Sequence, residues 1–183
     1  MLKKSLFIFT LLCVLLVYLG IADAATWNVP GDFDTIQDAI DASSDGDVVV
    51  VSSGEYESIT FGDVAITVES TGLGVARITG TTPVTFTPTA KISILDGFTI
   101  TGGTQSGIYI NDASPTIRNN EITGNSSTDD GGGIYILDGA PLIEWNTITD
   151  NHAAVGGGAI AMNSATPEIK RNIITHNTAI GGS

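Results

Sequence analysis

Cysteine and basic residues are both scarce in this sequence of 183 residues. The single cysteine, Cys13, lies in an apolar stretch near the N-terminus, so the rest of the chain holds no thiol for a disulfide or a thiolate metal site. Only 7 Lys and Arg stand against 20 Asp and Glu, and the formal net charge is −13. Nucleic acid is therefore disfavoured as a partner, since no basic stripe exists to displace counterions from phosphates. An anionic polysaccharide would also be repelled unless a divalent cation bridged it.

Long hydrophobic runs are missing as well, apart from one between Leu6 and Leu19, which is too short to span a bilayer comfortably. Two lysines precede this run and Ala22-Asp23-Ala24 follows it, an order typical of a secretory signal peptide. We therefore predict a signal peptide over residues 1–24, with an uncleaved membrane anchor as the alternative. The protein is then secreted, extracellular or held at the cell surface, with the periplasm as a further location, and no transmembrane segment remains after cleavage.

A repeat dominates the second half of the chain. The segment that begins at Pro115 returns at Pro141 and again at Pro167, 26 residues apart each time. Isoleucine fills the same positions in the three copies, which gives one column of Ile117, Ile143 and Ile169 and another of Ile122, Ile148 and Ile174. A fixed period of this length without a helical pattern inside it is typical of a solenoid.

Each copy consists of short extended runs. Apolar residues alternate from Gly107 to Ile110, which predicts a strand with Ile108 and Ile110 on one face. Three such strands separated by Asn and Gly form one rung of a parallel β-helix, in which equivalent residues of successive rungs lie about 4.8 Å apart. Burial of each inward isoleucine stabilises the stack by roughly 1.5–3 kcal/mol.

Polar residues form columns in the same register. Asparagine recurs in two of them, where stacked side-chain amides can hydrogen-bond along the column: Asn120, Asn146 and Asn172, then Asn125, Asn151 and Asn177. A third column places Arg118, Glu144 and Lys170 in sequence. We interpret it as a ladder of alternating charge, with a chance arrangement of exposed charges as the alternative.

These motifs resemble a known group. Gly-Gly-Gly-Ile-Tyr-Ile from Gly131, Pro-x-Ile-x-x-Asn-x-Ile from Pro115, and Asn-x-Ala-x-x-Gly-Gly-Gly from Asn151 are similar to repeats of right-handed parallel β-helix proteins, the pectin-lyase-like superfamily. The resemblance implies the fold of residues 62–183, with regular repeats from about Gly107. It does not imply one activity, because this fold hosts many.

The N-terminal part of the mature chain has a different pattern. Apolar residues at helical spacing predict one helix from Asp34 to Ala42, capped by Asp34 or Thr35. The Thr-Ile-Gln-x-Ala-Ile-x-Ala pattern resembles the entry segment of pectin methylesterases. We therefore assign residues 25–61 to an N-terminal cap with the first strands, and predict an all-β, right-handed parallel β-helix (solenoid) with an N-terminal capping α-helix.

Two regions resist a firm assignment. The strands between Ile59 and Phe98 are less regular, and the pattern does not assign them to particular sheets. At the other end, the chain stops at Ser183 where the next Gly-rich strand is due. We predict that C-terminal rungs are missing from this sequence, and the alternative is that something else covers that end.

Candidate site residues are few. In the pectate lyases of this superfamily, acidic residues on one sheet hold Ca²⁺, and the nearest match here is Asp112 over Asp138, although Ser164 breaks the column. A turn role is the alternative for both aspartates. Asp129 and Asp130 offer a similar choice between calcium and a solvated loop. No other cofactor is expected.

One aromatic residue is a candidate for sugar binding. Trp145 lies beside the charge column and is expected to point outward, where it could stack on a sugar ring or pack on neighbouring side chains. No catalytic residue is identified. We therefore predict a secreted or surface β-helix that acts as a non-catalytic scaffold or a carbohydrate-binding or surface-binding module. The alternative is a polysaccharide lyase or hydrolase acting on uronate-containing polymers, with its active residues outside this sequence.

Overall fold

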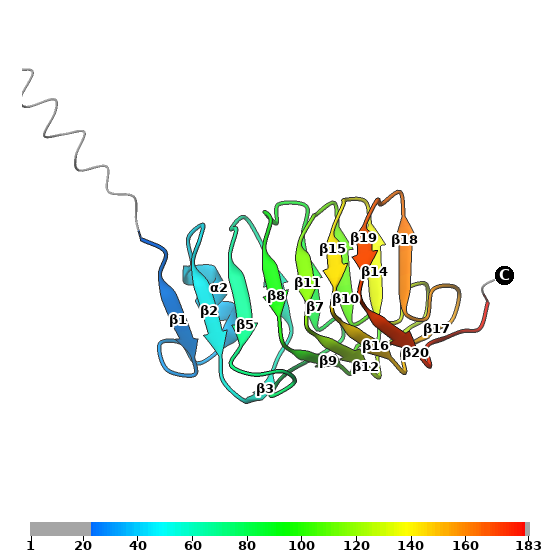
Figure 1. The fold of residues 1–183 in the computed structure, drawn as a ribbon, viewed down its shortest axis with the longest axis horizontal. Coiled ribbons are helices and arrows are strands. Elements are labelled where there is room, and N and C mark those ends of the chain that lie inside the picture. Colours follow the sequence, from blue (N-terminus) through cyan, green and yellow to red (C-terminus); the bar gives the residue numbers. More distant parts are fainter. Residues whose placement is uncertain (1–22, 182–183) are drawn as a thin grey trace, which may run out of the picture.

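The computed structural model describes residues 23–181, and these coil into a right-handed parallel β-helix of about six turns with one short helix, which confirms the predicted fold class (Figure 1). The predicted signal peptide lies outside the described residues, apart from its last two. Within residues 23–181, no helix is long and apolar enough to cross a membrane.

Three long parallel sheets form the walls of the solenoid, and a short fourth sheet joins them in the later turns. Sheet A contains β1 (Thr26–Val29), β2 (Val48–Val51), β5 (Thr67–Ser70), β8 (Ile94–Asp96), β11 (Thr116–Arg118), β15 (Leu142–Glu144) and β19 (Glu168–Lys170). Sheet B contains β3 (Gly54–Tyr56), β6 (Ala76–Thr79), β9 (Thr99–Thr101), β12 (Glu121–Thr123), β16 (Thr147–Thr149) and β20 (Ile173–Thr175).

The remaining strands complete each turn before the chain returns to sheet A. Sheet C contains β4 (Ile59–Phe61), β7 (Val84–Phe86), β10 (Ile108–Asn111), β14 (Ile134–Leu137) and β18 (Ile160–Asn163). Sheet D contains β13 (Ser126–Ser127), β17 (His152–Ala153) and β21 (Thr178–Ala179). Each late turn therefore runs from sheet A through B, D and C.

The predicted 26-residue register is confirmed. Ile117 pairs with Ile143, which in turn pairs with Ile169, and the second isoleucine column pairs in the same way on sheet B. Ile117 and Ile143 are fully buried. Identical side chains thus pack directly over one another, because parallel strands in register present the same position to the same face.

The asparagine columns are hydrogen-bonded ladders inside the wall. The Oδ1 atom of Asn146 accepts from the backbone N–H of Asn120 at 2.9 Å and from its side-chain amide at 3.2 Å. The Nδ2 atom of Asn146 donates to the carbonyls of Ile117 and Glu144 and to Oδ1 of Asn172, at 2.9, 3.0 and 3.0 Å. One amide therefore satisfies the backbone of the A-to-B corner in two neighbouring turns.

The helix α2 (Ile36–Ala42) lies at the N-terminal end of the solenoid (Figure 1). Thr35 is its N-cap and accepts a hydrogen bond from the backbone of Asp38. Gln37 bonds both backbone groups of Thr60, accepting from its N–H at 2.7 Å and donating to its carbonyl at 3.2 Å. Since Thr60 lies on β4, the first strand of sheet C, the helix covers an edge that would otherwise be unpaired, as expected of a cap.

Candidate functional site

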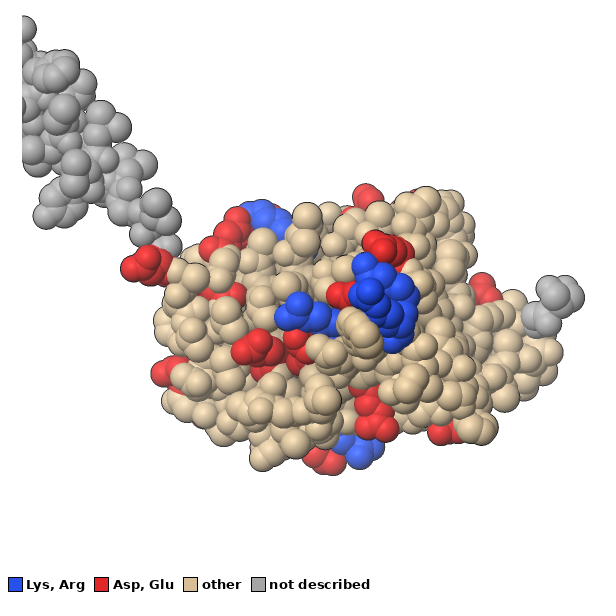
Figure 2. Space-filling view, viewed as in Figure 1, with Lys and Arg blue, Asp and Glu red and all other residues tan. Residues whose placement is uncertain are grey.

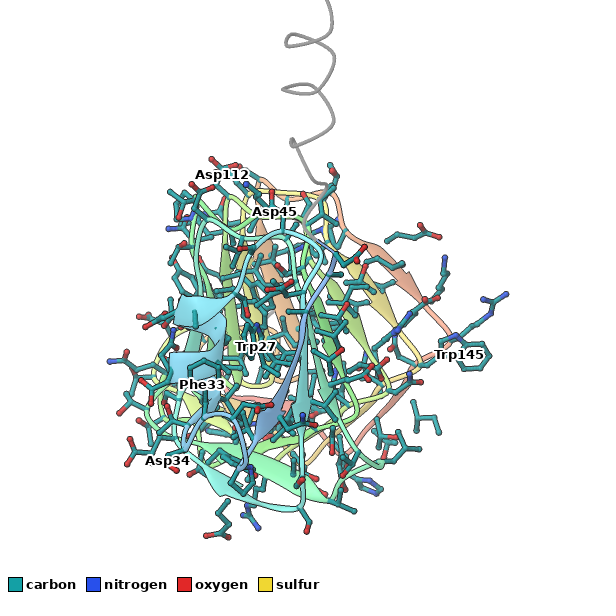
Figure 3. All side chains as sticks on the ribbon, turned by 90° about the vertical axis from the view of Figure 1, so that its left-hand side faces the viewer. Trp27, Phe33, Asp34, Asp45, Asp112 and Trp145 are labelled. Carbon is teal, nitrogen blue, oxygen red and sulfur yellow. The ribbon has the colours of Figure 1, made fainter. Side chains whose placement is uncertain are left out.

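Trp145 stands on the corner between sheets A and B and is 55% exposed, as predicted. Figure 3 shows its ring projecting away from the body of the solenoid. The corner needs a left-handed residue in each late turn, and Asn119, Trp145 and Arg171 occupy this position with φ of 55°, 59° and 56°. Such a backbone turns the side chain outward, so the indole is displayed by the geometry of the corner.

Arg171 covers one side of this indole. Its guanidinium carbon lies 5.1 Å from the centre of the Trp145 ring, a cation–π distance. On the Asn119 side lies a hollow of about 270 Å³, the tryptophan hollow, whose lining includes Leu73, Asn119, Glu121, Trp145 and Thr147. Because Trp145 stands between Asn119 and Arg171 along the solenoid axis, the hollow and the arginine lie on opposite sides of the ring.

The charge column beside Trp145 is longer than the sequence suggested. Arg118, Glu144 and Lys170 pair in register as predicted, and Nζ of Lys170 lies 3.8 Å from a carboxylate oxygen of Glu144. The closest contact of Arg118 is with Asp96 on the preceding turn, at 2.7 Å from Nε to Oδ2. The sequence reasoning missed Asp96 because it lies in a turn of a different length.

Basic residues are concentrated near this corner. Figure 2 shows Lys and Arg gathered over the face of sheet A, on a surface that is otherwise largely acidic or uncharged. Arg118 and Lys170 have carboxylate partners there. Among residues 23–181, no carboxylate lies within 4.0 Å of the Arg171 guanidinium. An incoming anionic group can therefore reach Arg171 without displacing a partner.

Asp112 and Asp138, the predicted calcium pair, lie one turn apart and are exposed. Their backbone is left-handed, with φ of 46° and 60°, and Ser164 occupies the same position in the next turn with φ of 57°. The left-handed turn after sheet C accounts for the choice of aspartate, which tolerates this conformation. Within residues 23–181, no group of three or more His, Cys, Asp or Glu is arranged to hold a metal ion, and calcium at this pair stays a prediction.

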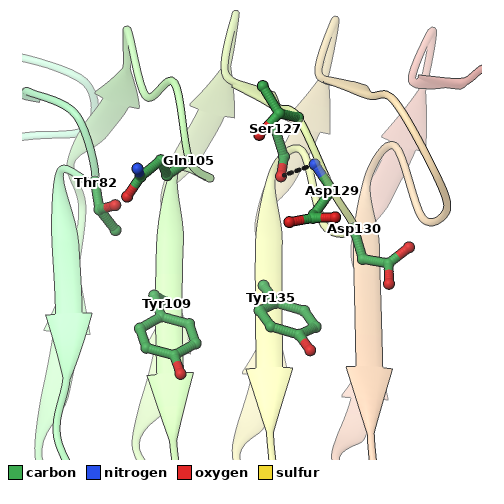
Figure 4. A pocket seen from close by; sticks show the side chains of 8 residues that line it. Thr82, Gln105, Tyr109, Ser127, Asp129, Asp130 and Tyr135 are labelled. Carbon is green, nitrogen blue, oxygen red and sulfur yellow. Dashed lines mark hydrogen bonds between the residues drawn. The ribbon is translucent and has the colours of Figure 1, made fainter.

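A second hollow, which the sequence reasoning missed, lies on the outer face of sheet C (Figure 4). Its volume is about 420 Å³. We call it the tyrosine pocket and define it by six of its lining residues: Gln105, Tyr109, Ser127, Asp129, Asp130 and Tyr135. The missed signal was the tyrosine between two inward isoleucines in two successive repeats, Tyr109 and Tyr135, which places two rings side by side on the outside of the wall.

The geometry of the two rings is that of a platform. The centres of Tyr109 and Tyr135 lie 5.8 Å apart and their planes differ by 16°. Each ring is half-buried. Thr85 and Ala161 occupy the same position on the strands to either side, so the platform is two residues wide.

Comparisons with known proteins were made on the sequence. The family model described as "Right handed beta helix region" matches residues 84–182. A cell surface glycoprotein of Methanothermus fervidus is 34% identical over 123 residues, which cover 62% of this chain and 21% of the glycoprotein. The chain thus spans about a fifth of the length of this curated relative. No solved structure matches the chain significantly.

Proposed function

Because the chain belongs to the right-handed β-helix family, whose fold alone does not define an activity, we propose its function from the corner site. The proposed function is that of a non-catalytic module, exported and held at the cell surface, that binds carbohydrate at Trp145. The likeness to a protein named a cell surface glycoprotein supports the location. The solenoid supplies a rigid frame on which the side chain is displayed.

The observation that carries the proposal is the indole with one side against a cation and the other beside a hollow. A sugar ring has an apolar face that stacks on an aromatic ring and a rim of hydroxyl groups that need hydrogen-bond partners. Trp145 offers the first contact, while Asn119, Glu121 and Thr147 line the same hollow and offer the second. Leu73, 75% exposed, adds apolar surface to the same lining.

Arg171 favours a carbohydrate that carries acidic groups. The whole chain repels anions at long range because its net charge is −13. At the corner, the guanidinium of Arg171 offers a bidentate contact to a carboxylate, the geometry for which arginine is best suited. An acidic sugar bound near Trp145 is therefore attracted locally.

Export is part of the proposal, and the first ordered turn supports it. The backbone nitrogen of Ala25 donates to a carboxylate oxygen of Asp47 at 2.7 Å, and the Ala25 carbonyl accepts from Val48 at 2.9 Å. Cleavage between Ala24 and Ala25 would therefore leave the new terminal ammonium on the carboxylate of Asp47. The solenoid would keep every contact that begins at Ala25.

N-glycosylation is not part of the proposal, although the relative is named a glycoprotein. The sequence contains one Asn-x-Ser/Thr acceptor, at Asn125, and this residue is 1% exposed. Its Nδ2 donates to the Ile100 carbonyl at 3.0 Å and to Oδ1 of Asn151 at 2.9 Å. A glycan on that nitrogen is incompatible with the folded ladder.

The proposal is tested by titrating the purified protein with oligogalacturonate and with an uncharged oligosaccharide of equal length, followed by tryptophan fluorescence and calorimetry. We expect binding to weaken at least about tenfold in Trp145→Ala, because the stacking surface is removed. Arg171→Ala is expected to lose the preference for the acidic ligand. Arg77→Ala is the matched control, since Arg77 is exposed on sheet B and has no carboxylate within 4.0 Å among residues 23–181.

Two outcomes would contradict the proposal. Unchanged affinity in a folded Trp145→Ala variant would remove the corner from any binding role. Release of unsaturated uronate products by the full-length gene product with added Ca²⁺, followed in the ultraviolet, would favour the alternative of a polysaccharide lyase.

A further inference from the structure

The tyrosine pocket differs from the corner site in its charge. Asp129 and Asp130 line it beside the two rings, and Gln105 is the other strongly polar side chain. No lysine, arginine or histidine is among its lining residues. Neither aspartate forms an ion pair with any residue in the range 23–181.

The loop that carries the two carboxylates is anchored through other atoms. The backbone N–H of Asp129 donates to Oγ of Ser127 at 3.1 Å, and its carbonyl accepts from the backbone N–H of Val155 at 3.1 Å. Figure 4 shows the side chains of Asp129 and Asp130 near one end of the ring pair. The carboxylate oxygens therefore remain available while the backbone is held.

We propose that the tyrosine pocket binds an organic cation, an ammonium group on a small apolar body. The faces of Tyr109 and Tyr135 carry the negative part of the aromatic quadrupole, which attracts a cation placed over them. Asp129 and Asp130 add two formal negative charges at the edge of the same hollow. An anion is repelled by this lining, and an uncharged ligand gains nothing from either feature.

The shape of the pocket agrees with this ligand class. Its volume of about 420 Å³ accommodates a small ammonium compound rather than a long chain. The platform ends at Thr85 on one side and Ala161 on the other, so the aromatic surface is limited to two rings. The pocket lies on sheet C, whereas Trp145 lies between sheets A and B, and the two proposals stand independently.

The probe for this proposal is choline, compared with its uncharged isostere in which carbon replaces the quaternary nitrogen. Both are titrated into the purified protein and followed by calorimetry and by the aromatic proton signals in NMR spectra. We expect choline to bind at least about tenfold more tightly than the isostere, since shape is shared and only the charge differs. We also expect the affinity to fall as salt is added, because the carboxylates are partly solvated.

Matched variants separate the two contributions. Asp129→Asn combined with Asp130→Asn keeps the shape of the loop and is expected to lower choline affinity about tenfold or more. Tyr135→Leu removes one ring face and lowers it, whereas Tyr135→Phe keeps the face and retains binding. Asp138→Asn changes an exposed carboxylate after the same strand, β14, and leaves binding unchanged.

Several results would overturn the proposal. They are equal affinity for choline and its isostere, tighter binding of an uncharged methyl glycoside than of choline, the same loss in Asp138→Asn as in the double variant, and no binding of choline by the folded wild-type protein. Circular dichroism and the urea midpoint establish that each variant is folded, so a loss of binding reports on the pocket.

Discussion

The early turns, from β1 to β8, and the late turns, from β11 onward, close the same cross-section in two ways. In the early part of sheet A, Thr26 pairs with Val48, Val48 with Thr67, and Thr67 with Ile94, which are steps of 22, 19 and 27 residues. The late steps, from Thr116 to Leu142 to Glu168, are 26 residues each.

The interiors differ in the same way. The early core contains a stacked pair, Phe61 and Phe86, with ring centres 4.3 Å apart, and Phe98 is buried at the next corner. The late corner is held by asparagine amides that bond their equivalents above and below. Apolar contacts tolerate turns of unequal length because they are not directional, whereas an amide ladder requires the same group at the same place in each turn.

The largest expected effect comes from removing one rung of the ladder. In Asn146→Leu, the backbone N–H of Asn120 and the carbonyl of Ile117 lose their buried partners. At about 1–3 kcal/mol for each orphaned group, we expect a loss of about 2–6 kcal/mol in the free energy of unfolding. Urea denaturation followed by circular dichroism measures this change.

Two controls make this a test of the comparison. Asn163→Ala changes an exposed asparagine of the late turns and is expected to cost less than about 0.5 kcal/mol. Phe61→Leu changes the early core and is expected to cost about 1–2 kcal/mol, because an apolar side chain remains to fill most of the space. If Asn146→Leu were no more costly than Phe61→Leu, directional bonding would not be what distinguishes the late turns.

The next effect is a gain in stability at the junction of the two regions. Ser106 is fully buried, its backbone φ is 120°, and its hydroxyl has no hydrogen-bond partner within the described part of the chain. The equivalent positions in the next two turns are Gly132 and Gly158. Ser106→Gly removes the strain and the orphaned hydroxyl at the cost of some chain entropy, and we expect a gain of about 1–2 kcal/mol.

Urea unfolding midpoints of Ser106→Gly and the wild type measure this gain, with an unchanged slope as evidence that the folded state is the same. Ser106→Ala serves as the matched control. It removes the hydroxyl and leaves the backbone strain, so it should recover only part of the gain. Equal stability of all three proteins would mean that the irregular turn is not strained.

The late turns were predictable from sequence because their period is written directly in the isoleucine and asparagine columns. Ile117 could be placed over Ile143, and the start of the ladder at Asn120 could be placed after Phe98, whose N–H bonds the Asn120 Oδ1 at 2.9 Å. The outward position of Trp145 followed from its column. In each case a local repeat fixes a contact between neighbouring turns.

Other features depend on contacts that no period describes. Gln37 bonds an edge strand 23 residues away, and Asp96 meets Arg118 across a turn of 22 residues. The tyrosine pocket needs the loop of Asp129 to come close to the strands that carry the rings. Its outward tyrosines were visible in the repeat, but the folding of a variable loop over them was not.

The smallest expected effect concerns pH and again separates the two regions. Hydrogen bonds lower the pKa of three carboxyl groups from the usual 3.8, and all three lie near the N-terminal end: Asp32 through the backbone and side chain of Asn28, Asp45 chiefly through Lys91, and Asp47 through the backbone of Ser44 and Ala25. Asp47 is 5% exposed and also accepts from the indole N–H of Trp27 at 3.2 Å.

A carboxyl group with a lowered folded pKa contributes stability above its unfolded pKa of 3.8, and this contribution is lost as the pH falls through the folded value. The late ladder is built from amides, which do not titrate. We therefore expect acidification from about pH 6 to about pH 3 to weaken hydrogen-exchange protection in β1 and β2 before β15 and β16. Asp47→Asn should reduce this difference. Equal loss of protection at both ends, after correction for intrinsic exchange rates, would contradict the idea that charged contacts fasten the early turns and neutral ladders the late ones.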